Sequence, residues 1–162
     1  MNSLLKIRVL IGAFMMGLIL SGITAFPLLH ELNILCSLLG VSEAQHATGY
    51  SGLTWWILRV REGLRATYAQ YPFMAYGTDW LAFGHLTIAL FFIAPMIDPV
   101  RNIAVLYTGL AACVAVIPLA LICGPIREIP FYWRLIDCSF GIVGFIPLWI
   151  AVKLVNRRIA AS

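Results

Sequence analysis

Four long apolar stretches constrain the fold of this chain more than any other feature of its sequence. They cover about residues 9–29, 80–97, 103–126 and 135–152, and the first and third contain no charged side chain. A helix that crosses a bilayer needs about 20 mostly apolar residues. In hydrocarbon a single helix pairs its own backbone amides and carbonyls, whereas a single strand does not. The sequence therefore predicts four transmembrane helices.

The composition supports a membrane protein over a soluble one. The chain has 162 residues, of which 62% are hydrophobic and 11% charged. Soluble domains contain about 25% charged residues, and a soluble fold of this length could not bury so much apolar surface. We therefore expect one all-α membrane domain over residues 1–162, an integral membrane four-helix bundle. The net charge is +4, but the basic residues form no patch away from the apolar stretches, so no nucleic-acid partner is expected.

The first apolar stretch also has an alternative interpretation as a secretory signal peptide. Lys6 and Arg8 would form its basic region, and Ile23-Thr24-Ala25 a mediocre cleavage site. The stretch is long for the hydrophobic part of a signal peptide. We therefore expect it to be kept as the first span.

Lysines and arginines near the span ends predict the orientation, because cytoplasmic loops carry an excess of them. With both termini in the cytoplasm, that side holds Lys6, Arg8, Arg101, Lys153, Arg157 and Arg158. The opposite side then holds Arg59, Arg61, Arg65, Arg127 and Arg134. The three arginines between positions 59 and 65 lie in the middle of a long loop, so they contribute less to the prediction of orientation. The pattern predicts a protein of a plasma (inner) membrane with both termini cytoplasmic.

An extra helix is expected between the first and second spans, over about residues 52–70. Its apolar side chains fall on one face at helical spacing: Leu53, Trp56, Ile57, Val60, Leu64 and Tyr68. Arg61, Glu62 and Arg65 lie on the other side, and Ser51 is placed to cap the first turn. This pattern predicts an amphipathic helix in the membrane interface. The alternative is that its apolar face packs on the bundle.

The segment before this helix carries two weaker signals. Leu32 to Leu39 is apolar and ends at Gly40, which predicts a turn or two of helix after Pro27. Ser42-Glu43-Ala44-Gln45 matches a capping box.

Close helix packing in a membrane requires small residues. Pairs of small residues occur in three spans: Gly17 with Ser21, Gly109 with Cys113, and Gly141 with Gly144. We expect the helices to approach one another at these positions.

Ionisable residues at membrane depth favour a functional site. Eight of them fall toward the predicted outer side: His30, Glu31, Asp79, His85, Arg127, Glu128, Arg134 and Asp137. They predict a polar site in the outer leaflet, roofed by the interfacial helix, which could hold a lipid headgroup, a quinone ring or a metal. The alternative is structural: Arg134 pairs with Asp137, and His85 donates to a backbone carbonyl.

The function predicted from these residues is binding of a partner protein or a lipid-like ligand, without catalysis. The alternatives are a redox or lipid-modifying enzyme that uses His85 with a carboxylate, and an oligomeric transporter or channel. The cofactor is not predicted by the sequence, and haem and a quinone are the two alternatives. Haem would need His30 and His85 to face each other, but they lie at different depths by residue count. Nucleotide-binding and hydrolase motifs are absent. The pairing of Cys36, Cys123 and Cys138 stays open.

Overall fold

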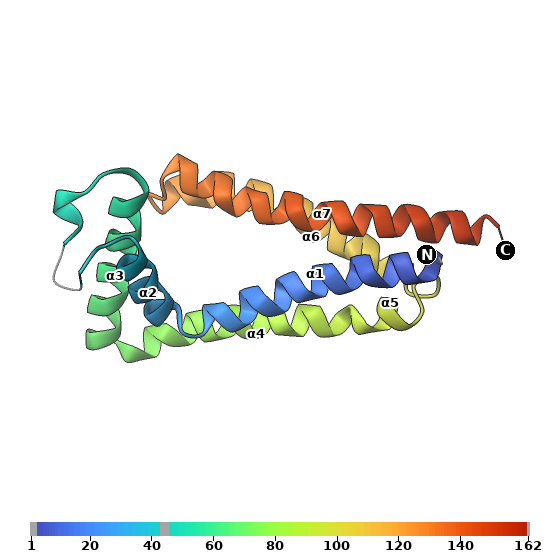
Figure 1. Ribbon diagram of the computed structural model, residues 1–162, viewed down its shortest axis with the longest axis horizontal. Coiled ribbons are helices and arrows are strands. Elements are labelled where there is room, and N and C mark those ends of the chain that lie inside the picture. Colours follow the sequence, from blue (N-terminus) through green and yellow to red (C-terminus); the bar gives the residue numbers. More distant parts are fainter. Residues whose placement is uncertain (1–2, 43–45, 162) are drawn as a thin grey trace. The chain divides into compact units, whose positions relative to one another are not determined.

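The computed structural model describes residues 3–42 and 46–161, and every regular element in those ranges is helical (Figure 1). In chain order they are α1 (Ser3–Ala25), α2 (Leu28–Leu38), η1 (Ala47–Gly49), α3 (Gly52–Gln70), η2 (Pro72–Ala75), α4 (Tyr76–Phe91), α5 (Ile93–Ile97), α6 (Ile103–Ile126) and α7 (Phe131–Ile159). The short elements η1 and η2 are 3₁₀ turns. The predicted all-α class is confirmed.

Four helical segments are long and apolar enough to cross a membrane: Ser3–Ala25, Pro72–Ile97, Ile103–Ile126 and Phe131–Ile159. Only 11 to 28% of the residues in their most apolar windows are buried within the protein. The number and order of the predicted segments are therefore confirmed, although their bounds differ. The last helix continues past the apolar stretch to Ile159, and Arg157 and Arg158 in its final turn favour this because cations stabilise the C-terminal end of a helix.

The chain divides into two compact units, Leu20–Leu86 and a unit drawn from Met1–Ile19 with Thr87–Ser162. The second of these, called here the α6–α7 unit, has four chain segments around one apolar cluster. Ile7 and Ile11 come from α1, Leu106 from α6, and Leu148 and Val155 from α7, all with no exposed surface. This unit alone is therefore a helical bundle.

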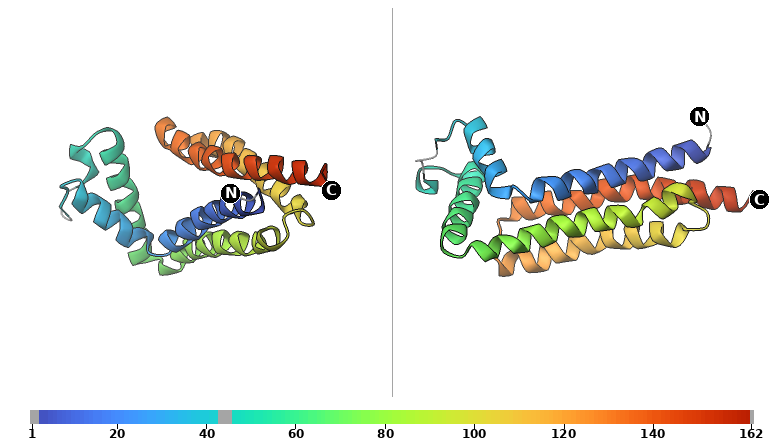
Figure 2. Two further views of the ribbon diagram at one scale, coloured as in Figure 1. Left: turned by 45° about the vertical axis from the view of Figure 1, so that its right-hand side comes forward. Right: turned by 90° about the horizontal axis from the view of Figure 1, so that it is seen from below.

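Glycines set the close contact between α6 and α7, which run side by side in both views of Figure 2. A Cβ on Gly109 would overlap the side chains of Phe92 and Leu148, and one on Gly141 would overlap the backbone carbonyl of Cys113. The contacts expected at Gly109 and Gly141 are confirmed. The contact expected at Gly17 is wrong, because a Cβ on this glycine would meet no atom within 4 Å.

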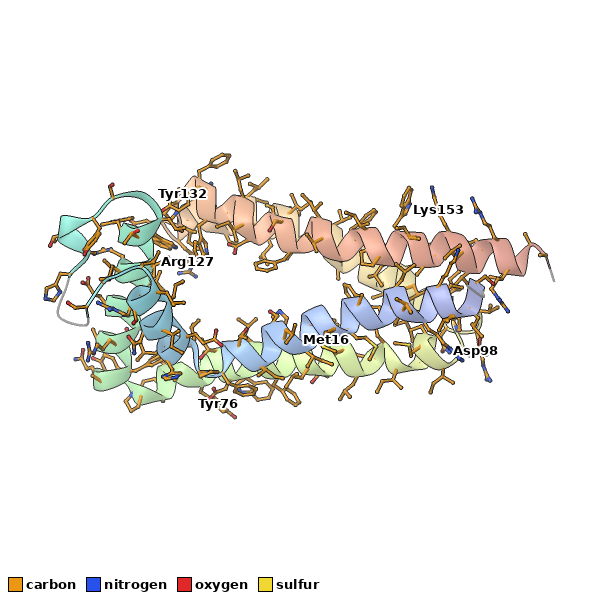
Figure 3. All side chains as sticks on the ribbon, viewed as in Figure 1. Met16, Tyr76, Asp98, Arg127, Tyr132 and Lys153 are labelled. Carbon is orange, nitrogen blue, oxygen red and sulfur yellow. The ribbon has the colours of Figure 1, made fainter. Side chains whose placement is uncertain are left out.

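One end of the α6–α7 unit is fastened by two arginines. Arg8 donates from Nε to the carbonyl of Met96 and from Nη2 to that of Ile97, both at 3.0 Å. Arg158 donates from Nη1 to Ser3 Oγ at 2.7 Å. The start of α1, the end of α5 and the end of α7 therefore lie at the same end of this unit, where Figure 3 labels Asp98 and Lys153.

The unit Leu20–Leu86, called here the α2–α3 unit, has its own apolar cluster. Leu32 and Cys36 from α2 pack with Ile57 and Leu58 from α3. The predicted extent of α3 is confirmed, although the hydroxyl of its N-cap residue Ser51 makes no capping hydrogen bond. The apolar face of α3 thus packs on α2.

Arg61 departs from its predicted place on the polar face of α3. Only 2% of its surface is exposed, and it is buried together with Ile57 and Leu58. Residues four apart on a helix lie on one face, so Arg61 follows Ile57 into the contact region. The apolar stem of an arginine can pack there like a hydrophobic side chain.

The short helix α2 ends as predicted at Gly40. Gly40 has φ +72°, its N–H donates to the carbonyl of Ser37 at 3.0 Å, and the N–H of Val41 donates to the carbonyl of Cys36 at 2.9 Å. These two bonds form a Schellman motif, in which glycine takes the left-handed position without a steric penalty. The capping box predicted from Ser42 to Gln45 extends beyond the described residues.

Candidate functional site

The eight ionisable residues predicted to form one site are divided equally between the two units. Arg127, Glu128, Arg134 and Asp137 belong to the α6–α7 unit, and His30, Glu31, Asp79 and His85 belong to the α2–α3 unit. Each group is therefore described within its own unit.

Arg134 packs by its apolar stem rather than by an ion pair. Its Cγ and Cδ occupy the place of a side chain on Gly124, and its guanidinium carbon lies 5.2 Å from the centre of the Phe131 ring. Arg134 and Asp137 make no ion pair, so the predicted pairing is wrong. Among the described residues of this unit, the half-buried Asp137 has no hydrogen-bond partner.

Arg127 and Glu128 form the turn that ends α6. Glu128 has φ +57°, its N–H donates to the carbonyl of Pro125 at 3.1 Å, and the N–H of Ile129 donates to the carbonyl of Gly124 at 2.9 Å. This is again a Schellman motif, with glutamate where glycine is usual. The backbone conformation of Glu128 therefore ends α6. This structural role explains the position of Glu128, and no ligand is needed to explain it.

We expect Glu128→Gly to stabilise the protein by about 1 kcal/mol. The left-handed conformation costs an L-residue roughly 1–2 kcal/mol, and an acid at a helix C-terminus costs about 0.3–1 kcal/mol. The extra flexibility of glycine in the unfolded chain offsets about 0.5–1 kcal/mol of this gain. The measurement is the midpoint of chemical unfolding in detergent. Glu128→Ala is the control, since it removes only the charge, and equal midpoints for the two variants would contradict the strain.

His85 is held by its own helix. Its Nδ1 lies 2.8 Å from the backbone carbonyl of Leu81, one turn earlier in α4. A carbonyl only accepts, so Nδ1 carries the proton in this bond. No described carboxylate of the unit lies within ion-pair distance of the ring. The predicted structural alternative, a hydrogen bond from His85 to a backbone carbonyl, is confirmed.

His30 and Glu31 begin α2. His30 is exposed and Glu31 half-buried. The N–H of Glu31 donates to the carbonyl of Pro27 at 3.0 Å, which closes the first turn of the helix. An acidic side chain at this position favours the helix, because the N-terminal end carries partial positive charge.

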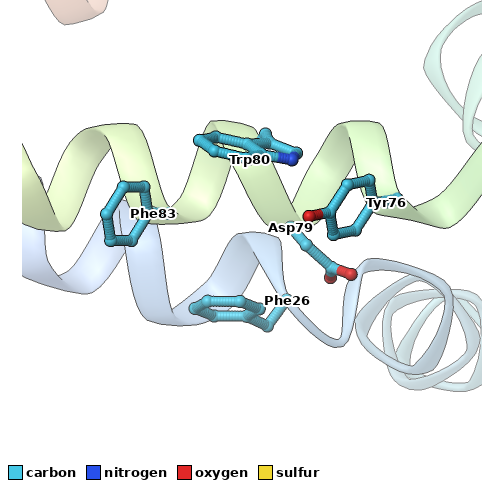
Figure 4. Close-up of a pocket in the computed structure, with 5 residues that line it drawn as sticks. All are labelled: Phe26, Tyr76, Asp79, Trp80 and Phe83. Carbon is cyan, nitrogen blue, oxygen red and sulfur yellow. The ribbon is translucent and has the colours of Figure 1, made fainter.

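Among the predicted site residues, Asp79 lies in the lining of an open pocket. An open pocket of about 290 Å³ is bounded by Phe26, Tyr76, Asp79, Trp80 and Phe83, and is called here the aromatic groove. Figure 4 shows the Asp79 carboxylate between the rings of Tyr76 and Phe26. Among the described residues of this unit, Asp79 has no ion-pair partner.

The spacing of the aromatic residues along α4 builds one wall of the groove. Tyr76, Trp80 and Phe83 are four and three residues apart, so they share a face of the helix. The rings of Tyr76 and Trp80 are 5.9 Å apart at 83°, and those of Trp80 and Phe83 are 5.7 Å apart at 88°. Both are edge-to-face contacts, which fix each ring against the next.

Phe26 forms the opposite wall, and Gly22 determines its position. A Cβ on Gly22 would lie 3.0 Å from both the Ala82 carbonyl oxygen and Leu86 Cγ. The end of α1 can therefore approach α4 closely only because this residue lacks a side chain. Phe26 follows one helical turn later and faces the rings of α4 (Figure 4).

The start of α4 is anchored to α3 by hydroxyl groups. Thr78 Oγ1 donates to the carbonyl of Ala75 at 2.7 Å, and it lies 3.4 Å from the hydroxyl of Tyr68. Because the Thr78 proton is already donated, Tyr68 donates in the second bond. This bond holds the helical turn that carries Tyr76 and Asp79.

The aromatic groove combines the faces of four aromatic rings with one carboxylate. Ring faces carry negative electrostatic potential and attract cations. The four aromatic side chains are about half exposed, from 48% for Phe26 to 62% for Tyr76. Its chemistry therefore suits an apolar group that carries a positive charge.

Of the residues that line the groove, only Asp79 is a candidate from the sequence. The spacing of Tyr76, Trp80 and Phe83 is the signal that could have revealed their shared wall.

Glu62 has a different role in the structure from the one that the sequence predicts. It is expected on a solvated face, but its Oε1 accepts the N–H of Ala47 at 2.9 Å and lies 3.1 Å from His46 Nδ1, so it joins η1 to α3.

The described part of the chain contains no group of three His, Cys, Asp or Glu side chains that could hold a metal ion, and its four cysteines are free thiols. No protein-family model, curated protein or solved structure matches the chain. Function therefore has to be inferred from its own residues and contacts.

Proposed function

We propose that this chain is an integral membrane protein with four transmembrane helices that binds a lipid through its aromatic groove. Only 11 to 28% of the residues in the most apolar windows of its four long helices are buried, and lipid is the solvent that suits such a surface. Exposed apolar surface of this extent would cause a water-soluble protein to aggregate.

The orientation that we propose places both termini in the cytoplasm of a plasma (inner) membrane. The start of α1 and the end of α7 share one end of the α6–α7 unit. That end carries Lys6, Arg8, Arg101, Lys153, Arg157 and Arg158, with Asp98 as its only acid. Such an excess of basic residues is typical of the cytoplasmic side.

The position of the aromatic groove along α4 supports a headgroup-level site. Asp79 lies in the first turn of α4, toward the beginning of the apolar segment Pro72–Ile97. We therefore place Asp79 at the outer boundary of the hydrocarbon core, which is about 30 Å thick. Tryptophan and tyrosine are enriched at this boundary, and the groove contains Trp80 and Tyr76. A lipid headgroup and the upper part of its acyl chains occupy the same depth.

The α2–α3 unit supplies the interfacial helix in this proposal. α3 is not apolar enough to be a span, and its Ile57 and Leu58 pack on α2. Arg59 on the same helix is exposed. We place α2 and α3 at the outer surface, where a packed pair with a charged outer face suits the headgroup region.

The aromatic groove is the observation that carries the proposal, and lipid retention is its test. Membranes are first extracted at alkaline pH to establish that the protein is integral, and the protein is then released in mild detergent for native mass spectrometry. We expect wild-type protein to keep a lipid mass. The double variant Trp80→Ala/Phe83→Ala should lose most of it, because two of the three rings in the α4 wall of the groove are removed.

The matched control is Phe140→Ala/Trp149→Ala, which removes the same two side-chain types from α7. Both side chains are exposed, and Trp149 contacts Lys153 rather than a pocket residue. We expect this control to retain lipid like the wild type. A bare wild-type monomer, or equal retention by both double variants, would contradict lipid binding in the groove. A protein subunit retained in place of lipid would support the partner-protein alternative instead.

A further inference from the structure

We infer that the aromatic groove selects phospholipids with a positively charged ammonium headgroup, such as ethanolamine or choline, over anionic ones. This inference rests on the proposed lipid binding and names the headgroup. The observation behind it is the lining of the groove, which contains one acidic and no basic side chain.

Asp79 provides the charge that distinguishes headgroups. Its carboxylate is half-buried in the groove, and no described cation of its unit lies within ion-pair distance. A headgroup ammonium can therefore take the place of a counter-ion. A phosphoglycerol headgroup has no positive charge to offer, so nothing compensates the repulsion between its phosphate and Asp79.

The aromatic rings favour the same ligand. Trp80 stands nearly perpendicular to both Tyr76 and Phe83, and Phe26 lies across the groove. Walls of several aromatic rings are a recurring way to bind ammonium and quaternary ammonium groups, because each ring face attracts the cation. The carboxylate and the rings act together on one charge.

The volume of the groove fits one headgroup rather than a whole lipid. Pockets for drug-sized ligands occupy about 300–1,000 Å³, and this one, at about 290 Å³, is smaller and open on one side. An ethanolamine or choline group can enter while the acyl chains stay along the apolar surface of α4.

The experiment is competition between lipids on the full-length protein. Protein in detergent is mixed with equal amounts of phosphatidylethanolamine, phosphatidylcholine and phosphatidylglycerol with identical acyl chains, and bound species are counted by native mass spectrometry. We expect both ammonium lipids to exceed phosphatidylglycerol at least about 5-fold. Asp79→Asn should reduce this preference by a similar factor, because it removes the charge and keeps the shape.

Asp98→Asn is the matched control. Asp98 lies at the opposite end of the same apolar segment, and its Oδ1 accepts the N–H of Arg101 at 3.1 Å, a bond that asparagine can also make. We expect it to keep the wild-type preference. Trp80→Phe is a second test variant, which keeps the wall but weakens the attraction for a cation, and should give an intermediate preference.

The outcomes separate the headgroup inference from the lipid-binding proposal. If lipid is retained and lost on Trp80→Ala/Phe83→Ala, but all three headgroups bind alike or Asp79→Asn changes nothing, the headgroup inference is overturned and lipid binding stands. If no lipid is retained, both fail. Choline and ethanolamine are also added as free solutes. We expect them not to displace lipid at millimolar concentration, and displacement would show that a soluble amine is the ligand.

Discussion

Replacing Arg61 with alanine is expected to loosen the α2–α3 unit by roughly 3 kcal/mol, within the range for breaking a buried charged interaction. Arg61 is 2% exposed and engaged with neighbouring groups, so its removal leaves a cavity and deprives those groups of a partner. The measurement is amide hydrogen exchange followed by mass spectrometry. A loss of this size should raise the exchange rate in α3 about 100-fold.

Arg59→Ala is the control for this experiment. It removes the same charge from the same helix, but its side chain is exposed, and surface substitutions change stability by about 0.5 kcal/mol or less. Arg61→Met separates packing from charge, because it keeps an unbranched apolar stem. If Arg61→Ala and Arg59→Ala exchange alike, Arg61 has no structural role in the unit. Recovery by Arg61→Met would assign that role to the stem.

Leucine at Gly141 is expected to force α6 and α7 apart, with a loss of roughly 3 kcal/mol in the free energy of unfolding. The first obstacle to a Cβ is the backbone carbonyl of Cys113, and the second is Val116 Cγ1. A flexible side chain could move aside, but a helix backbone can only shift as a whole. Because Gly109 of α6 packs closely against Leu148 of α7, separating the helices at Gly141 also loses this contact.

Cysteine reactivity gives a direct readout of this separation. Cys113 is half-buried and Cys138 is buried, whereas Cys123 is exposed. In Gly141→Leu we expect a thiol-specific reagent to modify Cys113 and Cys138 faster, with Cys123 unchanged as an internal reference. Gly17→Leu is the matched control, since nothing lies within 4 Å of that position. Equal unfolding midpoints for the two variants would contradict the tight contact.

The long helices could be predicted from the sequence because length and apolarity are local properties. The first span illustrates the limit. Its apolar stretch continues through Phe26 and Pro27 to Leu29, but α1 ends at Ala25 and a new helix begins at Leu28. Proline lacks the N–H of a helical bond and disfavours helix in the residue before it. The hydropathy of the stretch stays high across this position, so hydropathy alone does not predict that the helix is interrupted there.

Features that depend on a partner helix could not be predicted in the same way. Small residues occur throughout the spans, and sequence does not distinguish Gly17, which is open, from Gly22, which contacts α4. The charge of Arg61 predicts a polar face, whereas this side chain is buried, and the sequence does not show which surface covers it. Asp79 is a site candidate from its position in the sequence alone. The wall of the aromatic groove opposite α4 requires Phe26, which directly follows α1 and is far from α4 in the sequence.

The bond between Arg158 and Ser3 also has a consequence for biosynthesis. It joins positions 155 residues apart, so α1 is made well before the part of α7 that carries its partner. At about 5–20 residues per second, the interval is roughly 8–30 s. During that time Ile7 and Ile11 lack the α7 residues that finally cover them. Until α7 is made, Ile7 and Ile11 of the nascent α1 therefore have to contact lipid or the insertion machinery instead.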